Sequence, residues 1–215
     1  LITHLEQAIE TFNRSIKVLR TLSQLYIDSN QWASAEDILL VLREQTGSDA
    51  IDAREILLQL ALVYDKKDQI DKVESLLEKA IAQYPQNAEV YNFLGYTYAD
   101  RNIKLDKALS LIQKAHALDP EDGNIIDSLG WVYYRLGRYE DAVEQLKRAV
   151  ALMENHPVIL DHLGDALLQT GQKQKAIQSW KQALRYGPAY PAEFTSDFKQ
   201  RIKQKIDQVE KQNLP

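Results

Sequence analysis

The residues that could carry covalent or metal chemistry are few and scattered in this chain of 215 residues. Its four histidines are His4, His116, His156 and His162, and only the last two are near neighbours. No thiol or carboxylate stands beside that pair at the spacing typical of metal ligands. The sequence has no cysteine, which excludes thiolate catalysis and a disulfide framework. We therefore expect no metal and no cofactor.

The carboxylates also fit a role in helix formation better than one in catalysis. The pairs Glu121-Asp122 and Glu140-Asp141 stand where helices or loops should begin, and acidic side chains stabilise the positive end of a helix. The chain has neither a glycine-rich phosphate loop nor a Gly-x-Ser-x-Gly nucleophile turn. These observations predict a protein that is not an enzyme.

Recognition is the chemistry that remains, because aromatic, amide and charged side chains recur beside a repeated Leu-small pair. An extended or helical peptide uses such side chains as anchors and hydrogen-bond partners. The expected partner-binding residues, on the concave groove of a helical array, are Leu58, Leu62, Asn92, Tyr96, Asp127, Trp131, Tyr134, Arg135, Asp161 and Asp165. The alternative is that Tyr96 and Trp131 pack between neighbouring helices and only partly face the groove.

Charge narrows the class of partner. The net charge of −5 argues against a nucleic-acid binder, which would carry a clustered basic surface. Acidic residues also outnumber basic ones in the expected groove. We therefore expect a neutral or basic protein or peptide segment rather than an acidic tail.

The elements that would hold these residues come from an internal repeat. Its small residues in the first helices are Ser23, Ala61, Gly95, Gly130 and Gly164, at spacings of 38, 34, 35 and 34. In the second helices Ala35, Val73, Ala108, Ala142 and Ala176 keep nearly the same period. Such a period predicts stacked helical hairpins, in which each unit buries its apolar face against its neighbours.

The predicted fold is therefore all-α: a right-handed superhelix of antiparallel helix pairs with a C-terminal capping helix. We divide the chain into the second half of an upstream repeat (1–15), five repeats (16–53, 54–87, 88–122, 123–156 and 157–190) and the cap (191–215). The first segment implies that the chain is the C-terminal part of a longer array, and its open edge is a possible self-association surface.

Small residues should mark close helix contacts. Glycine inside a helix costs about 1 kcal/mol relative to alanine, so it needs a packing reason. We expect Gly95, Gly130 and Gly164 to face Ala108, Ala142 and Ala176 respectively. Gly137 and Gly171 should end first helices in the left-handed conformation. In the cap, an apolar stripe runs through Phe194, Phe198, Ile202, Ile206 and Val209.

These patterns resemble the tetratricopeptide repeat (TPR) family over residues 16–190. The phrases LGYTYADR and LGWVYYRLGRYEDAVEQLKRA are also similar to the C-terminal repeats of bacterial envelope TPR proteins of the outer-membrane lipoprotein type. That resemblance implies a scaffold or adaptor in envelope protein processing or assembly, facing the periplasm. The Lys, Arg and Asn cluster with which some TPR proteins hold a chaperone C-terminus is not matched, so that function is not carried over.

Two other readings stay open. The repeats could be the regulatory or targeting arm of a longer enzyme, or a self-association module. The absence of cysteine suits a periplasm and a cytosol equally, and no apolar run is long enough to span a bilayer.

Overall fold

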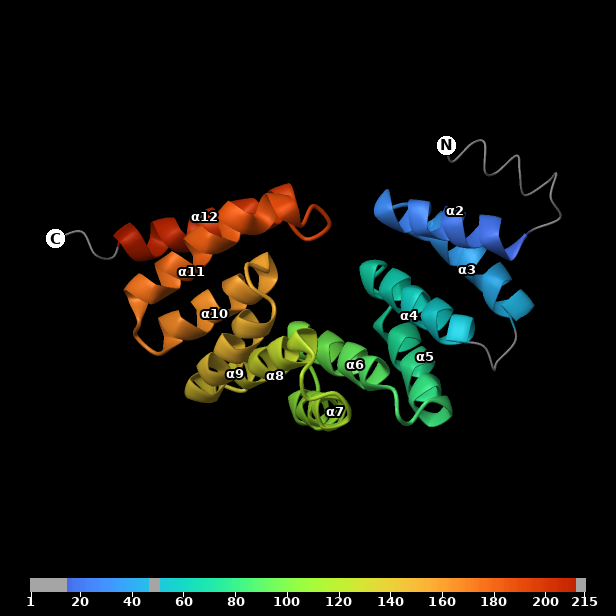
Figure 1. The fold of residues 1–215 in the computed structure, drawn as a ribbon, viewed down its shortest axis with the longest axis horizontal. Helices are drawn as coiled ribbons and strands as arrows, with labels where there is room; N and C mark the ends of the chain where they lie inside the picture. The colour runs from blue at the N-terminus through green and yellow to red at the C-terminus, as the bar shows by residue number, and fades with distance from the viewer. Residues whose placement is uncertain (1–14, 47–50, 212–215) are drawn as a thin grey trace. The chain divides into compact units, whose positions relative to one another are not determined.

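A computed structural model describes residues 15–46 and 51–211 of the chain. Regular structure in these ranges is entirely helical, as the sequence predicts (Figure 1). The first helices of successive pairs are α2 (Ile16–Asp28), α4 (Ile51–Lys66), α6 (Ala88–Asp100), α8 (Gly123–Arg135) and α10 (Pro157–Gln169). The second helices are α3 (Trp32–Thr46), α5 (Ile70–Gln83), α7 (Leu105–Leu118), α9 (Tyr139–Leu152) and α11 (Lys173–Tyr186). A short 3-10 helix, η1 (Gly187–Ala189), then leads to α12 (Ser196–Lys211). The segment 1–14, with most of the expected upstream half-repeat, lies outside the described residues.

The chain forms two compact units, residues 1–90 and 91–215. In the first, α2 packs with α3 and α4 packs with α5. Leu22, Leu39, Leu60 and Leu77 are fully buried there, one from each helix. Each lies on the apolar face that the helical periodicity of its segment predicts.

The second unit is built from α6 to α12, and α8 and α10 make extensive contacts with their second helices α9 and α11. One extended cluster of its buried residues joins Leu146 of α9, Leu163 of α10, Trp180 of α11 and Ile202 of α12. The core is therefore continuous from one pair to the next and ends under α12, as in a repeat array.

A left-handed residue closes every described hairpin. Gly137 and Gly171 both have φ of +76°, which confirms their predicted place after α8 and α10. The equivalent positions in the earlier hairpins are Asn30, Asp68 and Asn102, at φ of 57°, 56° and 56°. Asparagine and aspartate reach this conformation more readily than other side chains with a Cβ, so the turn is kept where glycine is absent.

The helical glycines do mark close contacts. The expected alanine is among the nearest neighbours only at Gly95, where Ala108 O would lie 3.1 Å from the added Cβ, and in all three cases a larger side chain lies closer. A Cβ on Gly95 would lie 2.6 Å from Ile112 Cγ1, and one on Gly130 would lie 2.6 Å from Leu146 Cγ. At Gly164 the nearest atom is Trp180 Nε1, at 2.3 Å. Each partner lies four residues after the expected alanine. The reason is that a helical side chain leans toward the N-terminus and covers the preceding turn.

The helix α12 caps the second unit. Its residues Phe198, Ile202, Ile206 and Val209 are buried in the cluster that contains Trp180. The cap helix begins at Ser196, later than the segment boundary at 191. Thr195 sets this start, because its hydroxyl accepts a hydrogen bond of 3.2 Å from the Phe198 N–H.

Candidate functional site: the first-helix faces

The polar side chains of α8 and α10 meet in a buried pair. His162 Nδ1 lies 2.9 Å from Asp127 Oδ1 and 3.2 Å from Asp127 Oδ2, and the two residues are 6% and 7% exposed. They are 35 positions apart in the sequence, so the contact joins neighbouring repeats. A buried carboxylate needs a partner of this kind, because an unpaired charge is strongly disfavoured away from water.

Aromatic rings cover this pair. Trp131 stacks on His162 with ring centroids 4.1 Å apart, and on Tyr134 at 4.9 Å. The Arg135 guanidinium lies over the same indole at 4.8 Å. Arg135 also donates hydrogen bonds to the carbonyl oxygens of Ala99, at 3.0 Å, and of Asp100, so it ties α8 to the C-terminal end of α6. The arrangement is a layer of stacked rings that links α6, α8 and α10.

A second group of charges joins α10 to the cap. Lys205 Nζ lies 2.7 Å from Asp161 Oδ1 and 2.8 Å from Asp165 Oδ2, so one ammonium group bridges two carboxylates. Arg201 Nη2 lies 3.4 Å from Asp161 Oδ2. The side chains of Asp161 and Asp165 are only 4% and 14% exposed. The helix α12 therefore covers the carboxylates that the sequence placed in the groove.

Burial and neighbouring charges shift the pKa values of these groups. Burial lowers the pKa of His162. The charge and hydrogen bond of Asp127, with the charges of Asp161 and Asp165, raise it by a larger amount, so the pKa of His162 lies above its ordinary value. Burial, followed by the charge of Asp161, raises the pKa of Asp165 despite the nearby Lys205. Burial is also the main cause that raises the pKa of Tyr134.

The expected groove residues fall into two groups by exposure. Asp127, Trp131 and Asp161 are less than a tenth exposed. Asp127 and Trp131 contact His162 between α8 and α10, whereas Asp161 is covered by α12. Trp131 therefore packs between neighbouring helices, which is the alternative that the sequence left open for it. Those that keep part of their surface open are Leu58 and Leu62 on α4, Asn92 and Tyr96 on α6, Tyr134 and Arg135 on α8, and Asp165 on α10. A role for any of them in partner binding stays a prediction.

The sequence reasoning missed His162, Arg201 and Lys205. His162 was considered only as a metal ligand, and the cap helix only through its apolar stripe. The sequence contains no clear signal for these partners, because Asp127 and Asp161 were placed in an open groove and their burial is visible only in the structure. Among the described residues, no three His, Cys, Asp or Glu side chains are grouped as metal ligands would be. The described helices also include none with the length and apolar character of a membrane span.

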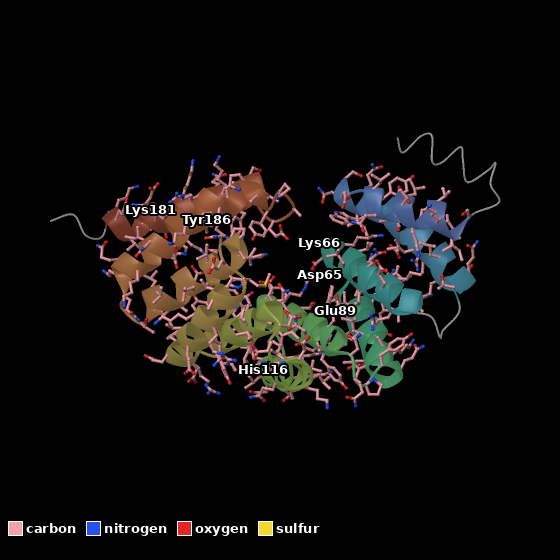
Figure 2. The ribbon with its side chains drawn as sticks, viewed as in Figure 1. Asp65, Lys66, Glu89, His116, Lys181 and Tyr186 are labelled. Atoms are coloured by element: carbon pink, nitrogen blue, oxygen red, sulfur yellow. The ribbon has the colours of Figure 1, made fainter. Side chains whose placement is uncertain are left out.

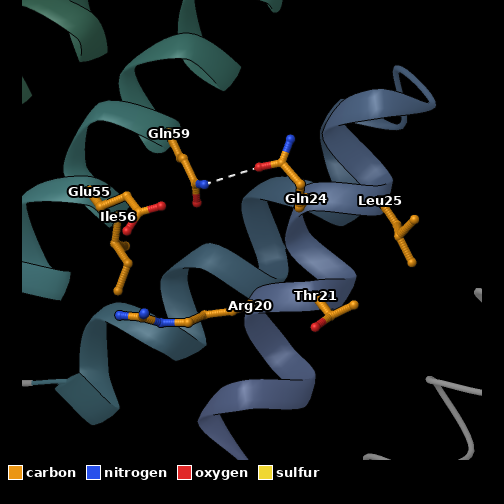
Figure 3. A pocket seen from close by; sticks show the side chains of 7 residues that line it. All are labelled: Arg20, Thr21, Gln24, Leu25, Glu55, Ile56 and Gln59. Carbon is orange, nitrogen blue, oxygen red and sulfur yellow. Dashed lines mark hydrogen bonds between the residues drawn. The ribbon is translucent and has the colours of Figure 1, made fainter.

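The first unit has an open hollow between its two first helices (Figure 3). Its volume is about 410 Å³, and Gln59 of α4 reaches across it to Gln24 of α2, where Nε2 donates to Oε1 at 3.3 Å. The lining residues are Arg20, Thr21, Gln24 and Leu25 from α2 and Glu55, Ile56 and Gln59 from α4. Leu58 and Leu62, the residues predicted on this helix, are not among them.

The paired helices, the regular left-handed turns and the continuous core define an all-α repeat protein of the solenoid class. Three models described as tetratricopeptide repeat match residues 55–87, 86–155 and 159–190, which together make more than half of the chain. The chain belongs to the tetratricopeptide repeat family. A search of curated proteins returned no match.

Solved structures agree with this assignment. TTC0263, a thermophilic TPR protein of Thermus thermophilus, is 22% identical over 88% of this chain and 98% of that chain, with a TM-score of 0.74. Yeast Tom70 is 18% identical over 98% of this chain and 43% of that chain, with a TM-score of 0.71. MamA AMB-1 is 27% identical over 80% of this chain and 98% of that chain, with a TM-score of 0.57. At these identities the first two support the fold alone.

Proposed function

We propose that this chain is a non-catalytic scaffold that binds a peptide segment of a protein partner on its first-helix faces. The observation that carries the proposal is the hollow between α2 and α4. Family membership supports the coarser part, because TPR arrays are typically protein-interaction modules. The proposed partner segment is neutral to basic.

The chemistry of the hollow fits an extended backbone. Gln24 and Gln59 join their amides across an exposed contact of 3.3 Å, at the long end of the hydrogen-bond range. Each amide has both a donor and an acceptor, so the pair can exchange this contact for the N–H and C=O of a peptide. Leu25, which is partly exposed, supplies apolar surface for one side chain, and the buried Ile56 lies at the base of the hollow.

Charged groups at the hollow determine which charge the bound segment should carry. Glu55 lines the hollow from α4 and is exposed, so it favours a cationic side chain on the bound segment. Arg20 lines the hollow from α2 and would disfavour a second cationic side chain close by. A segment with one basic residue beside an apolar residue is the chemistry that satisfies both walls.

Selection from a displayed random-peptide library tests this proposal, because the library samples many segment chemistries at once. Peptides selected on the native chain are titrated against Thr21→Trp, which places an indole in the hollow. Thr21 is exposed, and its hydroxyl bonds the carbonyl of Lys17 one turn back, so the substitution should leave the fold intact. We expect affinity to fall at least about tenfold, since a filled pocket loses its anchor contact.

The matched control is Ser110→Trp on α7. Ser110 is also exposed, and its hydroxyl also bonds the carbonyl one turn back, of Asp106. The same peptides should bind this variant as they bind the native chain. Equal binding to both variants, or selection of acidic peptides only, would contradict the proposal.

The finer role in bacterial envelope protein processing or assembly rests on the sequence phrases alone. Its first test is the position of the whole protein in the source cell, by fractionation into envelope and cytosol. An envelope location would support the adaptor role, and a cytosolic one would end it. If the repeats instead regulate an enzyme, the full-length protein should contain a catalytic domain fused to them.

A further inference from the structure

Two second helices carry matching hollows on their outer surface. One lies on α5, with a volume of about 490 Å³, and one on α11, with about 550 Å³. The first is lined by Asp71, Glu74, Ser75, Glu78, Lys79 and Ala82. The second is lined by Gln174, Ile177, Gln178, Lys181, Gln182 and Arg185. In the phase that aligns Val73 with Ala176, these are the same six positions of two different repeats.

The two hollows have opposite charge. Three carboxylates and one ammonium group line the hollow on α5, whereas Lys181 and Arg185 line the one on α11 with no carboxylate. Over its whole length α11 contains no Asp or Glu, although the chain has a net charge of −5. Figure 2 marks Lys181 on this helix. Lys181 Nζ is 2.8 Å from Glu210 Oε1 of α12, but both side chains stay about half exposed.

The equivalent positions on the helices between them are of mixed sign. On α7 they include Asp106 and Lys114, and on α9 they include Glu140, Glu144, Lys147 and Arg148. The equivalent positions are therefore acidic on α5, balanced in charge on α7 and α9, and basic on α11. The acidic face of α5 in one copy is therefore complementary in charge to the basic face of α11 in another.

We infer that the outer face of α11 docks on the outer face of α5 of a second copy of this chain. Charge complementarity selects this occupant. In this contact Lys181 and Arg185 of one copy face the carboxylates that line the α5 hollow of the other. Exposed ion pairs contribute about 0–1 kcal/mol each and are screened by salt, so the association is weak and salt-sensitive.

The symmetry of this contact has a consequence. The two faces are different surfaces, so each copy keeps one of them available after the first contact forms. Contacts of this type build rings or open chains rather than closed two-fold dimers. The residues that line the hollow between α2 and α4 take no part in the contact, so self-association is independent of the proposed peptide binding.

Charge exchange between the two faces tests the inference. One variant carries Gln178→Glu and Arg185→Glu, which makes the α11 face acidic and leaves the Lys181–Glu210 pair in place. The other carries Ser75→Lys and Glu78→Lys, which makes the α5 face basic. The control carries Lys199→Glu and Gln200→Glu on exposed positions of α12, with the same change in net charge as the first variant. Circular dichroism first establishes that all are folded.

Sedimentation velocity at low salt then gives the apparent association constant of each protein over a range of concentrations. We expect the native chain and the control to associate beyond a dimer, and added salt to reverse this. The apparent association constant of each face variant alone should fall by about tenfold or more, because like charges then oppose each other. An equimolar mixture of the two face variants should recover it, since the mixture again pairs opposite charges.

The mixture separates a specific contact from a general effect of charge. A native chain that stays monomeric at low salt and high concentration would overturn the inference. So would association that both face variants retain, because it would then involve another surface. Failure of the mixture to recover what each variant lost would equally rule out the pairing of α11 with α5.

Discussion

Removal of the Lys205 ammonium group should destabilise the second unit far more than removal of an exposed lysine on the same surface. Lys205→Met keeps the length and apolar stem of the side chain but leaves Asp161 and Asp165 without their main partner. These carboxylates are 4% and 14% exposed and lie 2.7 and 2.8 Å from the ammonium nitrogen. The loss of one member of a buried ion pair is strongly destabilising, because the remaining charge cannot return to water.

The expected loss is about 2–3 kcal/mol at neutral pH, below the figure of about 3–5 kcal/mol for a fully buried pair. Two features of the structure reduce it. The Lys205 side chain is itself 23% exposed, and Arg201 remains 3.4 Å from Asp161. The control is Lys181→Met, which breaks a contact of similar length, 2.8 Å to Glu210, between side chains that are 59% and 49% exposed. That change should cost less than about 1 kcal/mol.

Urea unfolding followed by tryptophan fluorescence measures both changes. The background variant Trp32→Phe leaves Trp131 and Trp180, which both belong to the second unit, so the signal reports that unit alone. A lower pH should narrow the gap between Lys205→Met and its parent. The pKa of Asp165 is already raised, so its carboxylate takes up a proton first and the repulsion from Asp161 disappears. Equal losses for the two lysine variants, or no loss at Lys205, would refute this reasoning about burial.

Three further predictions concern the second unit. Gly164→Ala should lower the free energy of unfolding of this unit by about 1–2 kcal/mol in the same urea assay. The new methyl group overlaps the buried Trp180 ring, and the cost of that overlap exceeds the gain in helix propensity. An unchanged unfolding midpoint would contradict the close approach of the two helices. Gly171→Ala meets no atom within 4 Å but sits at φ of +76°, so strain alone should cost about 1 kcal/mol, measured as a lower melting temperature with an unchanged circular dichroism spectrum. His162 has a raised pKa, so its interaction with Asp127 stabilises the fold fully below pH 6.5 and is lost as the pH rises through that raised value. Unfolding midpoints measured from about pH 6 upward should therefore fall less steeply in His162→Gln than in the native chain; parallel slopes would show that the histidine does not cause the effect.

The sequence predicts the helices well, because their determinants are local. The spacing of Gly95, Gly130 and Gly164 and the matching alanines specify helical hairpins, and Pro157 marks the start of α10 through its fixed φ. Even here the side chain nearest to each glycine lies one helical turn beyond the expected alanine, although Ala108 does contact Gly95 through its carbonyl oxygen. Periodicity gives the face of a helix but not the lean of the side chain that fills it.

The polar contacts between repeats were much harder to predict. The expected groove residues Asp127 and Asp161 do lie on first helices, yet they bind His162 and Lys205, 35 and 44 residues later. Which of the cations on α12 reaches Asp161 depends on the rotation of that helix about its axis. That rotation follows from how Phe198 and Ile202 pack on Trp180, which is a property of the assembled core.

The contacts that cross from repeat to repeat also determine how the second unit comes apart under force or denaturant. In a linear array the stability of each module and the coupling to its neighbour are separate quantities, and the coupling decides whether modules melt singly or together. Here Arg135 joins α8 to α6, the aspartate–histidine pair joins α10 to α8, and Lys205 joins α12 to α10. Each link is a specific polar bond superimposed on apolar packing. When force is applied at its C-terminal end, the second unit should unfold in one large step rather than repeat by repeat.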